Sequence, residues 1–131
     1  MTQEPQLPPL TDWQIEVLRR FASLDVGIEE MRRSLAGVFD FDFQPKQKTE
    51  TGYLDRRTAK GHFRLPEPGI VVTRSHVSNA LEQKRLGLIS ERELVYWATI
   101  LLQNDAYVLD PGDEDLIAEW LNDISVNLDA T

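Results

Sequence analysis

The sequence predicts a mainly α fold with a small β element, built as a single domain of 131 residues. Apolar residues recur at helical spacing in several segments, and helix-capping patterns stand at their starts. One short segment alternates phenylalanine with aspartate, as a half-buried strand does. We therefore expect four principal helices and one two-stranded antiparallel element. The helical domain is expected over residues 11–126, after a flexible leader over 1–10 and before a frayed tail over 127–131.

The first helix is predicted over residues 13–24, where apolar residues recur every three or four positions. Thr11 or Asp12 precedes it and can cap its free N–H groups. A short additional helix is expected over residues 28–36, because Gly37 follows its last apolar position and suits a helix end. The two segments together form a helical hairpin.

A strand is predicted at residues 38–43, where three phenylalanines alternate with Asp40 and Asp42. The two aspartates would face solvent and discourage edge-to-edge pairing. Because a strand needs a partner, residues 61–65 are expected to pair with it in antiparallel fashion. The intervening residues 44–60 are polar and rich in charge, which indicates a long hairpin loop. Two prolines at residues 66–69 predict a rigid turn.

The strongest helical signal lies at residues 71–103, which predict two helices joined by a tight turn. Thr73 is the expected cap of the first, and Val77, Ala80 and Leu81 define its apolar face. Ser90 and Glu93 form a capping box at the start of the second. That second helix is apolar almost all round, so we expect it to be buried on two sides as the core helix.

The last third of the chain is expected to end in a helix over residues 113–125. Residues 104–109 before it are ambiguous, since they suit either a helix end or a short extended segment. Asp110 opens a turn with the proline and glycine that follow it. The three tryptophans, Trp13, Trp97 and Trp120, are expected to anchor the core.

Charge is distributed unevenly along the chain, which carries a net charge of −8. Residues 93–131 contain nine acidic residues and no basic one, whereas all 14 lysines and arginines lie before them. A negative face repels nucleic acid and anionic membrane and attracts basic partners. The simpler alternative is that the charge serves solubility. The chain has no cysteine, no signal-like start and no long apolar run, so we expect a cytoplasmic protein without a membrane span.

The candidate binding residues are the acids of this last third, and we expect no metal, cofactor or nucleic acid there. Their spacing lacks the alternation of a calcium loop, and helix capping explains the first-turn acids. Neither His62 nor His76 has a nearby sequence partner that would mark a catalytic or metal site. The predicted partner-binding residues are Asp105, Asp110, Asp113, Glu114, Asp115 and Glu119.

An alternative to binding a basic protein is that the N-terminal hairpin is a DNA-binding helix–turn–helix. Arg19, Arg20, Arg32 and Arg33 lie on its two helices. The second helix is short and opens with two acids, and phosphate contacts dominate DNA affinity. The charge therefore argues against DNA binding.

A pattern over residues 70–121 resembles the helical core of colicin-type immunity proteins. It comprises Thr73, Val77 and Ala80, followed by Leu-Gly-Leu-Ile-Ser-Glu-Arg-Glu-Leu-Val-Tyr-Trp-Ala over residues 86–98. The resemblance covers about two fifths of the chain, and the residues before Ile70 have no counterpart in it. It implies a protein that is not an enzyme and that covers the basic cleft of a toxin, often a nuclease, with an acidic surface.

Two functions follow as hypotheses. The first is a non-enzymatic inhibitor of immunity or antitoxin type that binds a basic protein partner. The alternative is a structural or regulatory protein that forms a homodimer through exposed apolar residues. An enzyme ranks third, because it would require a pocket with perturbed carboxylates or a placed histidine.

Overall fold

The computed structural model describes residues 8–42, 47–50, 52–54 and 58–126 of the chain. The five helices of this part are α1 (Asp12–Ala22), α2 (Ile28–Ser34), α3 (Arg74–Arg85), α4 (Glu91–Gln103) and α5 (Glu114–Ser125). Its strands are β1 (Phe39–Asp42), β2 (Gln47–Thr49), β3 (Gly52–Leu54), β4 (Thr58–Gly61), β5 (Ile70–Val72) and β6 (Tyr107–Leu109). The mainly α class is confirmed. The prediction of four helices is wrong, because α2 is a fifth helix in its own right. Residues 1–7 of the predicted leader and the predicted tail, 127–131, lie outside the described residues.

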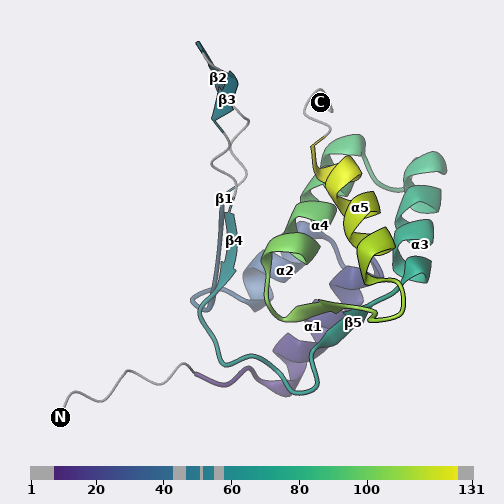
Figure 1. Ribbon diagram of the computed structural model, residues 1–131. Helices are drawn as coiled ribbons and strands as arrows, with labels where there is room; N and C mark the ends of the chain where they lie inside the picture. Colours follow the sequence, from purple (N-terminus) through teal and green to yellow (C-terminus); the bar gives the residue numbers. More distant parts are fainter. Residues whose placement is uncertain (1–7, 43–46, 51, 55–57, 127–131) are drawn as a thin grey trace.

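The β element was predicted to be antiparallel, and this is wrong for the sheet that packs with the helices. Strands β5 and β6 pair in parallel, with Ile70 opposite Tyr107 and Val72 opposite Leu109. Ile70 and Val72 are buried while Val71 is 46% exposed, which is the alternation of a half-buried strand. A parallel pair needs a long crossover, and here α3 and α4 supply it (Figure 1).

The ambiguous segment before the last helix is therefore extended and forms β6. Its first hydrogen bond to β5 runs from the N–H of Ile70 to the carbonyl of Ala106, at 2.9 Å. Asn104 ends α4 in an extended conformation, and its side-chain oxygen accepts from the N–H of Ala106 at 3.0 Å. This local bond turns the chain from helix into strand.

A second β feature is a two-stranded ribbon that projects from the helical body (Figure 1). Strand β1 pairs with β4 in antiparallel register, and β2 pairs with β3 further out. The predicted partner, residues 61–65, is wrong, since β4 ends at Gly61. The reason lies in Phe63, which is only 2% exposed and packs over Gly61. A Cβ at Gly61 would lie 2.1 Å from Cε1 of Phe63, so the aromatic ring fills the space where a side chain would stand.

The core is centred on α4, as the all-round apolar pattern predicted. Trp97, Ala98, Ile100 and Leu101 are buried on this helix, and α5, α3 and α1 all pack against it. The indole N–H of Trp97 donates to the carbonyl of Ala22 at 3.2 Å. These contacts tie α4 to the C-terminal end of α1.

The predicted caps are present at α1 and α4. Thr11 and Gln14 exchange backbone and side-chain hydrogen bonds at the start of α1. Ser90 and Glu93 do the same at the start of α4, with distances of 3.1 and 3.2 Å. Each box satisfies two N–H groups that a helix start leaves free.

Two apolar residues lie further out than predicted. Trp13, an expected core anchor, is 51% exposed, and the guanidinium of Arg20 lies 5.4 Å from its ring centroid. Leu81, expected on the buried face of α3, is 46% exposed. No helix in the described part of the chain is long and apolar enough to cross a membrane.

Candidate protein-binding surface

The six acids predicted to bind a partner do not form one cluster. Asp105 lies before β6, and the other five lie after it, on the turn into α5 and on α5 itself. A strand of three residues spans about 10 Å, so β6 separates Asp105 from the rest. Asp105 is exposed and lies beside Phe63 and Leu65 in a separate depression. The structure thus brings together the acids from Asp110 to Glu119 and leaves Asp105 apart.

Two of the remaining acids have local structural partners. A carboxylate oxygen of Asp110 accepts from the N–H of Gly112 at 3.3 Å, which shapes the turn. Asp113 is the N-cap residue of α5, but its side chain makes no capping bond. It instead pairs with Arg74, with 3.0 Å between Nε and Oδ2. The expectation that capping accounts for Asp113 is therefore corrected to an ion pair between two helix starts.

That ion pair follows from the topology. Because β5 and β6 are parallel, α3 and α5 leave the same edge of the sheet and run side by side (Figure 1). Their first turns are thereby brought together, with Arg74 opening α3 and Asp113 preceding α5. Both side chains are partly exposed, so the pair contributes little to stability.

An acidic stripe runs along the outer face of α5 and consists of Asp115, Glu119 and Asp123. These residues are spaced four apart, so their side chains lie on one face of the helix. All three are exposed, and none pairs with a basic residue in the described ranges. Glu114 is also exposed, in the first turn of the helix. Asp123 was missed by the sequence prediction, although its spacing from Glu119 was visible there.

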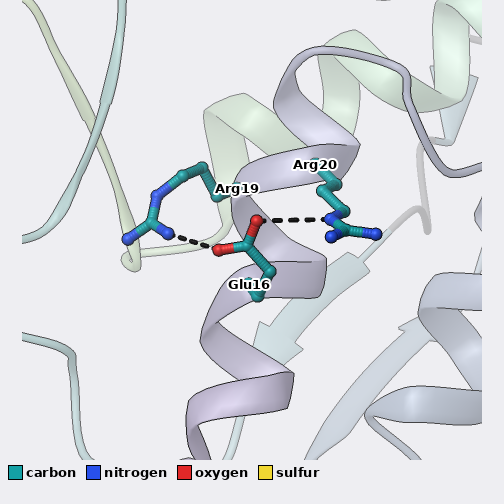
Figure 2. Close-up of polar contacts among 3 residues, drawn as sticks. All are labelled: Glu16, Arg19 and Arg20. Carbon is teal, nitrogen blue, oxygen red and sulfur yellow. Dashed lines mark hydrogen bonds and ion pairs between the residues drawn. The ribbon is translucent and has the colours of Figure 1, made fainter.

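The glutamates of α1 and α2 pair with arginines of their own helices. Glu16 accepts from Arg19 at 2.5 Å and from Arg20 at 3.2 Å (Figure 2). On α2, Glu30 pairs with Arg33 at 2.5 Å. The N-terminal arginines that could have contacted DNA are therefore engaged with acids of their own helices. The stripe on α5 differs because its helix carries no basic residue.

The neighbouring helix α3 does not neutralise the stripe either. Besides Arg74, its cations are Lys84, which lies 2.8 Å from Glu91, and Arg85, which pairs with Glu82. The hydrogen bond between Arg85 and Glu82 lowers the pKa of the Glu82 carboxyl and raises that of the guanidinium. Each of these cations thus has an acid of its own, and the charge on the α5 side stays uncompensated.

An apolar groove lies between α3 and α5, next to the acidic stripe. It has a volume of about 380 Å³ and is lined by Val77, Ser78 and Leu81 on one side and by Trp120, Asp123 and Ile124 on the other. Leu81 is exposed because it lies at the rim of this groove, where periodicity alone predicted burial. Asp123 belongs to both features, so the stripe and the groove form one continuous surface. We call it the α3–α5 face.

His76 has a structural role that the sequence pattern did not reveal. It is the third residue of α3, and its Nδ1 accepts from the N–H of Thr73 at 2.9 Å. The hydroxyl of Thr73 lies 3.2 Å from the same nitrogen. His76 thus stands where a capping box usually has Glu or Gln. Burial lowers the pKa of its imidazole, in keeping with a neutral ring that accepts at Nδ1.

The described residues provide no group of three or more histidines or carboxylates that could hold a metal ion. His62 is exposed and follows β4. Burial raises the pKa of the Tyr107 phenol well above its ordinary value, and its hydroxyl donates to the carbonyl of Leu18 at 2.6 Å. That tyrosine is a core residue and is not accessible to a substrate.

No protein-family model matches the chain, and no curated protein or solved structure shows a significant match to it.

Proposed function

We propose that this chain is a non-enzymatic binding protein that engages a basic protein partner through its α3–α5 face. The observation that carries the proposal is the acidic stripe on α5, which has no cationic partner in the described part of the structure. Like charges four residues apart on a helix repel each other by a few tenths of a kcal/mol. For Glu119 and Asp123 this arrangement does not serve folding, and a basic partner would relieve the repulsion.

The apolar groove supports a protein partner rather than a small cation. Binding sites between proteins combine a desolvated apolar centre with a polar rim. Leu81, Trp120 and Ile124 offer the apolar centre, Asp123 lines the groove beside them, and Glu119 lies one turn earlier on α5. Electrostatic attraction would raise the rate of encounter, while the apolar contacts would slow dissociation.

Among such binding proteins, an inhibitor of immunity or antitoxin type is the class we favour. The resemblance of residues 70–121 to colicin-type immunity proteins implies it, and α3 and the part of α5 up to Leu121 lie within that segment. A basic nucleolytic cleft is a surface that a row of carboxylates would complement. Of the predicted acids, we assign Asp115 and Glu119 to the polar rim of the contact, with Asp123 added.

Affinity capture with a matched pair of variants tests this proposal. The triple variant Asp115→Asn, Glu119→Gln and Asp123→Asn removes the stripe. A control variant, Asp12→Asn, Asp25→Asn and Glu67→Gln, removes the same net charge from exposed positions elsewhere. We expect the wild type and the control to retain the same basic protein at low salt and release it at high salt, because surface attraction is screened. Equal retention by both variants would refute the proposal.

A homodimer is the alternative function, and exposed leucines at the turn between α3 and α4 favour it. Leu86 is 56% exposed and Leu88 is 68% exposed. Sedimentation velocity of the purified protein distinguishes the two proposals. A dimer that persists at high salt and dissociates on substitution of Leu88 by serine would support the alternative.

A further inference from the structure

The groove between α3 and α5 has walls that suit one kind of occupant. Both walls belong to helices of 12 residues, each about 18 Å long at 1.5 Å per residue, and the groove lies between residues 77–81 of α3 and 120–124 of α5. Backbone N–H and carbonyl groups within helices are already bonded to each other. An extended peptide would therefore find no open main-chain groups to pair with, as it does at a sheet edge. Side-chain packing must supply the contact.

The apolar groups in the groove are arranged for packing against another helix. Leu81 is 46% exposed at one rim, while Trp120 and Ile124 are partly buried against the core on the other. Val77 is fully covered and forms the floor. Ridges of side chains from a third helix fit such a groove between two parallel helices.

The charge on the two sides of the groove is unequal, and this determines the sign of the charge that a bound partner must carry. On the α3 rim, Arg85 is bound to Glu82, so its charge is compensated. On the α5 side, Asp123 in the lining and Glu119 one turn before it have no described cationic partner. An occupant that fits this groove must carry basic residues along one flank.

We propose that the partner presents a basic amphipathic helix, which lies between α3 and α5. Its apolar residues, spaced three and four apart, pack over Leu81 and Trp120, and its lysines or arginines lie beside Glu119 and Asp123. This inference rests on the proposed function and specifies the element of the partner that is recognised. The spacing of anchors is that of other helix-in-groove complexes.

The probe is a synthetic peptide of about 15 residues with leucines at helical spacing and lysines on the flanks, compared with a scrambled peptide of the same composition. Isolated helices of this length are marginal in water, so binding in the groove is expected to raise the helicity measured by circular dichroism. We expect the amphipathic peptide to bind about tenfold more tightly than the scrambled one. It should also change the fluorescence of Trp120, and the change should disappear in Trp120→Phe.

Two leucine variants provide the matched control. Leu81 lies in the groove and Leu88 lies outside its lining, and both are exposed, so neither substitution should prevent folding. Leu81→Ser is expected to weaken peptide binding about tenfold, and Leu88→Ser to leave it unchanged. Equal effects of the two substitutions, or failure of both peptides to bind, would overturn the inference.

The remaining outcomes separate this inference from the proposed function. If both peptides bind equally and the triple acid variant binds neither, attraction to a basic partner stands and the helical element is refuted. If the triple acid variant still captures the same basic protein, the proposed function itself fails. A homodimer that dissociates in Leu81→Ser would also overturn the inference, because a second copy would then occupy the groove.

Discussion

Two buried aromatic side chains donate hydrogen bonds to α1, and the structure predicts that they contribute unequally to stability. The indole N–H of Trp97 bonds the carbonyl of Ala22, and the hydroxyl of Tyr107 bonds that of Leu18. Ala22 is the last residue of α1, so its carbonyl has no donor within the helix. The carbonyl of Leu18 lies one turn earlier, where the regular helical pattern provides a second donor at the N–H of Ala22.

The magnitudes follow from this difference. Trp97→Phe leaves a buried acceptor without a donor, which costs about 1–3 kcal/mol. The smaller ring also leaves a cavity in a fully buried site, which adds about 1–2 kcal/mol. Tyr107→Phe removes one hydrogen bond, orphans no carbonyl and creates almost no cavity, so its expected cost is about 1 kcal/mol. We therefore expect the tryptophan substitution to cost about three times as much.

Urea unfolding followed by circular dichroism measures both effects. The free energy of unfolding falls linearly with urea, so each substitution lowers the midpoint in proportion to its cost. The ratio of the two midpoint shifts does not depend on the slope, provided that the slope is the same for both proteins. Equal shifts, or a larger shift for Tyr107→Phe, would refute the argument that the orphaned carbonyl at the end of α1 dominates.

Three further predictions concern titration and charge. Burial lowers the pKa of His76, so the contribution of its neutral ring to stability should be complete above pH 6.5 and lost as the pH falls further. The variant His76→Gln keeps an acceptor for the N–H of Thr73 and does not titrate, so it should lose less stability in urea unfolding at about pH 5. Tyr107 should not contribute to the tyrosinate absorbance in an alkaline titration until the protein unfolds, because burial raises the pKa of its phenol. Asp123→Asn should increase the free energy of unfolding by about 0.3–1 kcal/mol, because an acid near the C-terminus of a helix opposes its dipole. The increase should appear as a slightly higher midpoint of thermal unfolding.

The sequence was sufficient where structure depends on near neighbours. The capping box of Ser90 and Glu93 involves residues three apart, and it formed as predicted. The two-sided burial of α4 followed from an apolar pattern over a single helix. Both are local or periodic features, and such features can be recognised without knowing what packs against them.

The failures occurred where distant segments meet. Strand β5 has three residues, too few for an alternating pattern to stand out, and its partner β6 lies beyond two intervening helices. The exposure of Leu81 depends on how far α5 lies from α3, which no residue of α3 encodes. Histidine at the third position of α3 was not seen as a cap because the usual residues there are Glu and Gln. The candidate site was predicted as a set of acids. Its apolar groove was not predicted, because the groove depends on how α3 and α5 pack together.

The position of the acidic stripe is best understood from what α5 requires to fold. Its inner face, with Ile117 and Leu121 fully buried, supplies the packing that holds it against α4. Glu114 and Asp115 in its first turn complement the helix dipole and so favour the helix. Glu119 and Asp123 gain nothing from the dipole, repel each other at a spacing of four residues and lack a described cation. Folding thus accounts for the first two acids and not for the last two, of which Asp123 lines the groove.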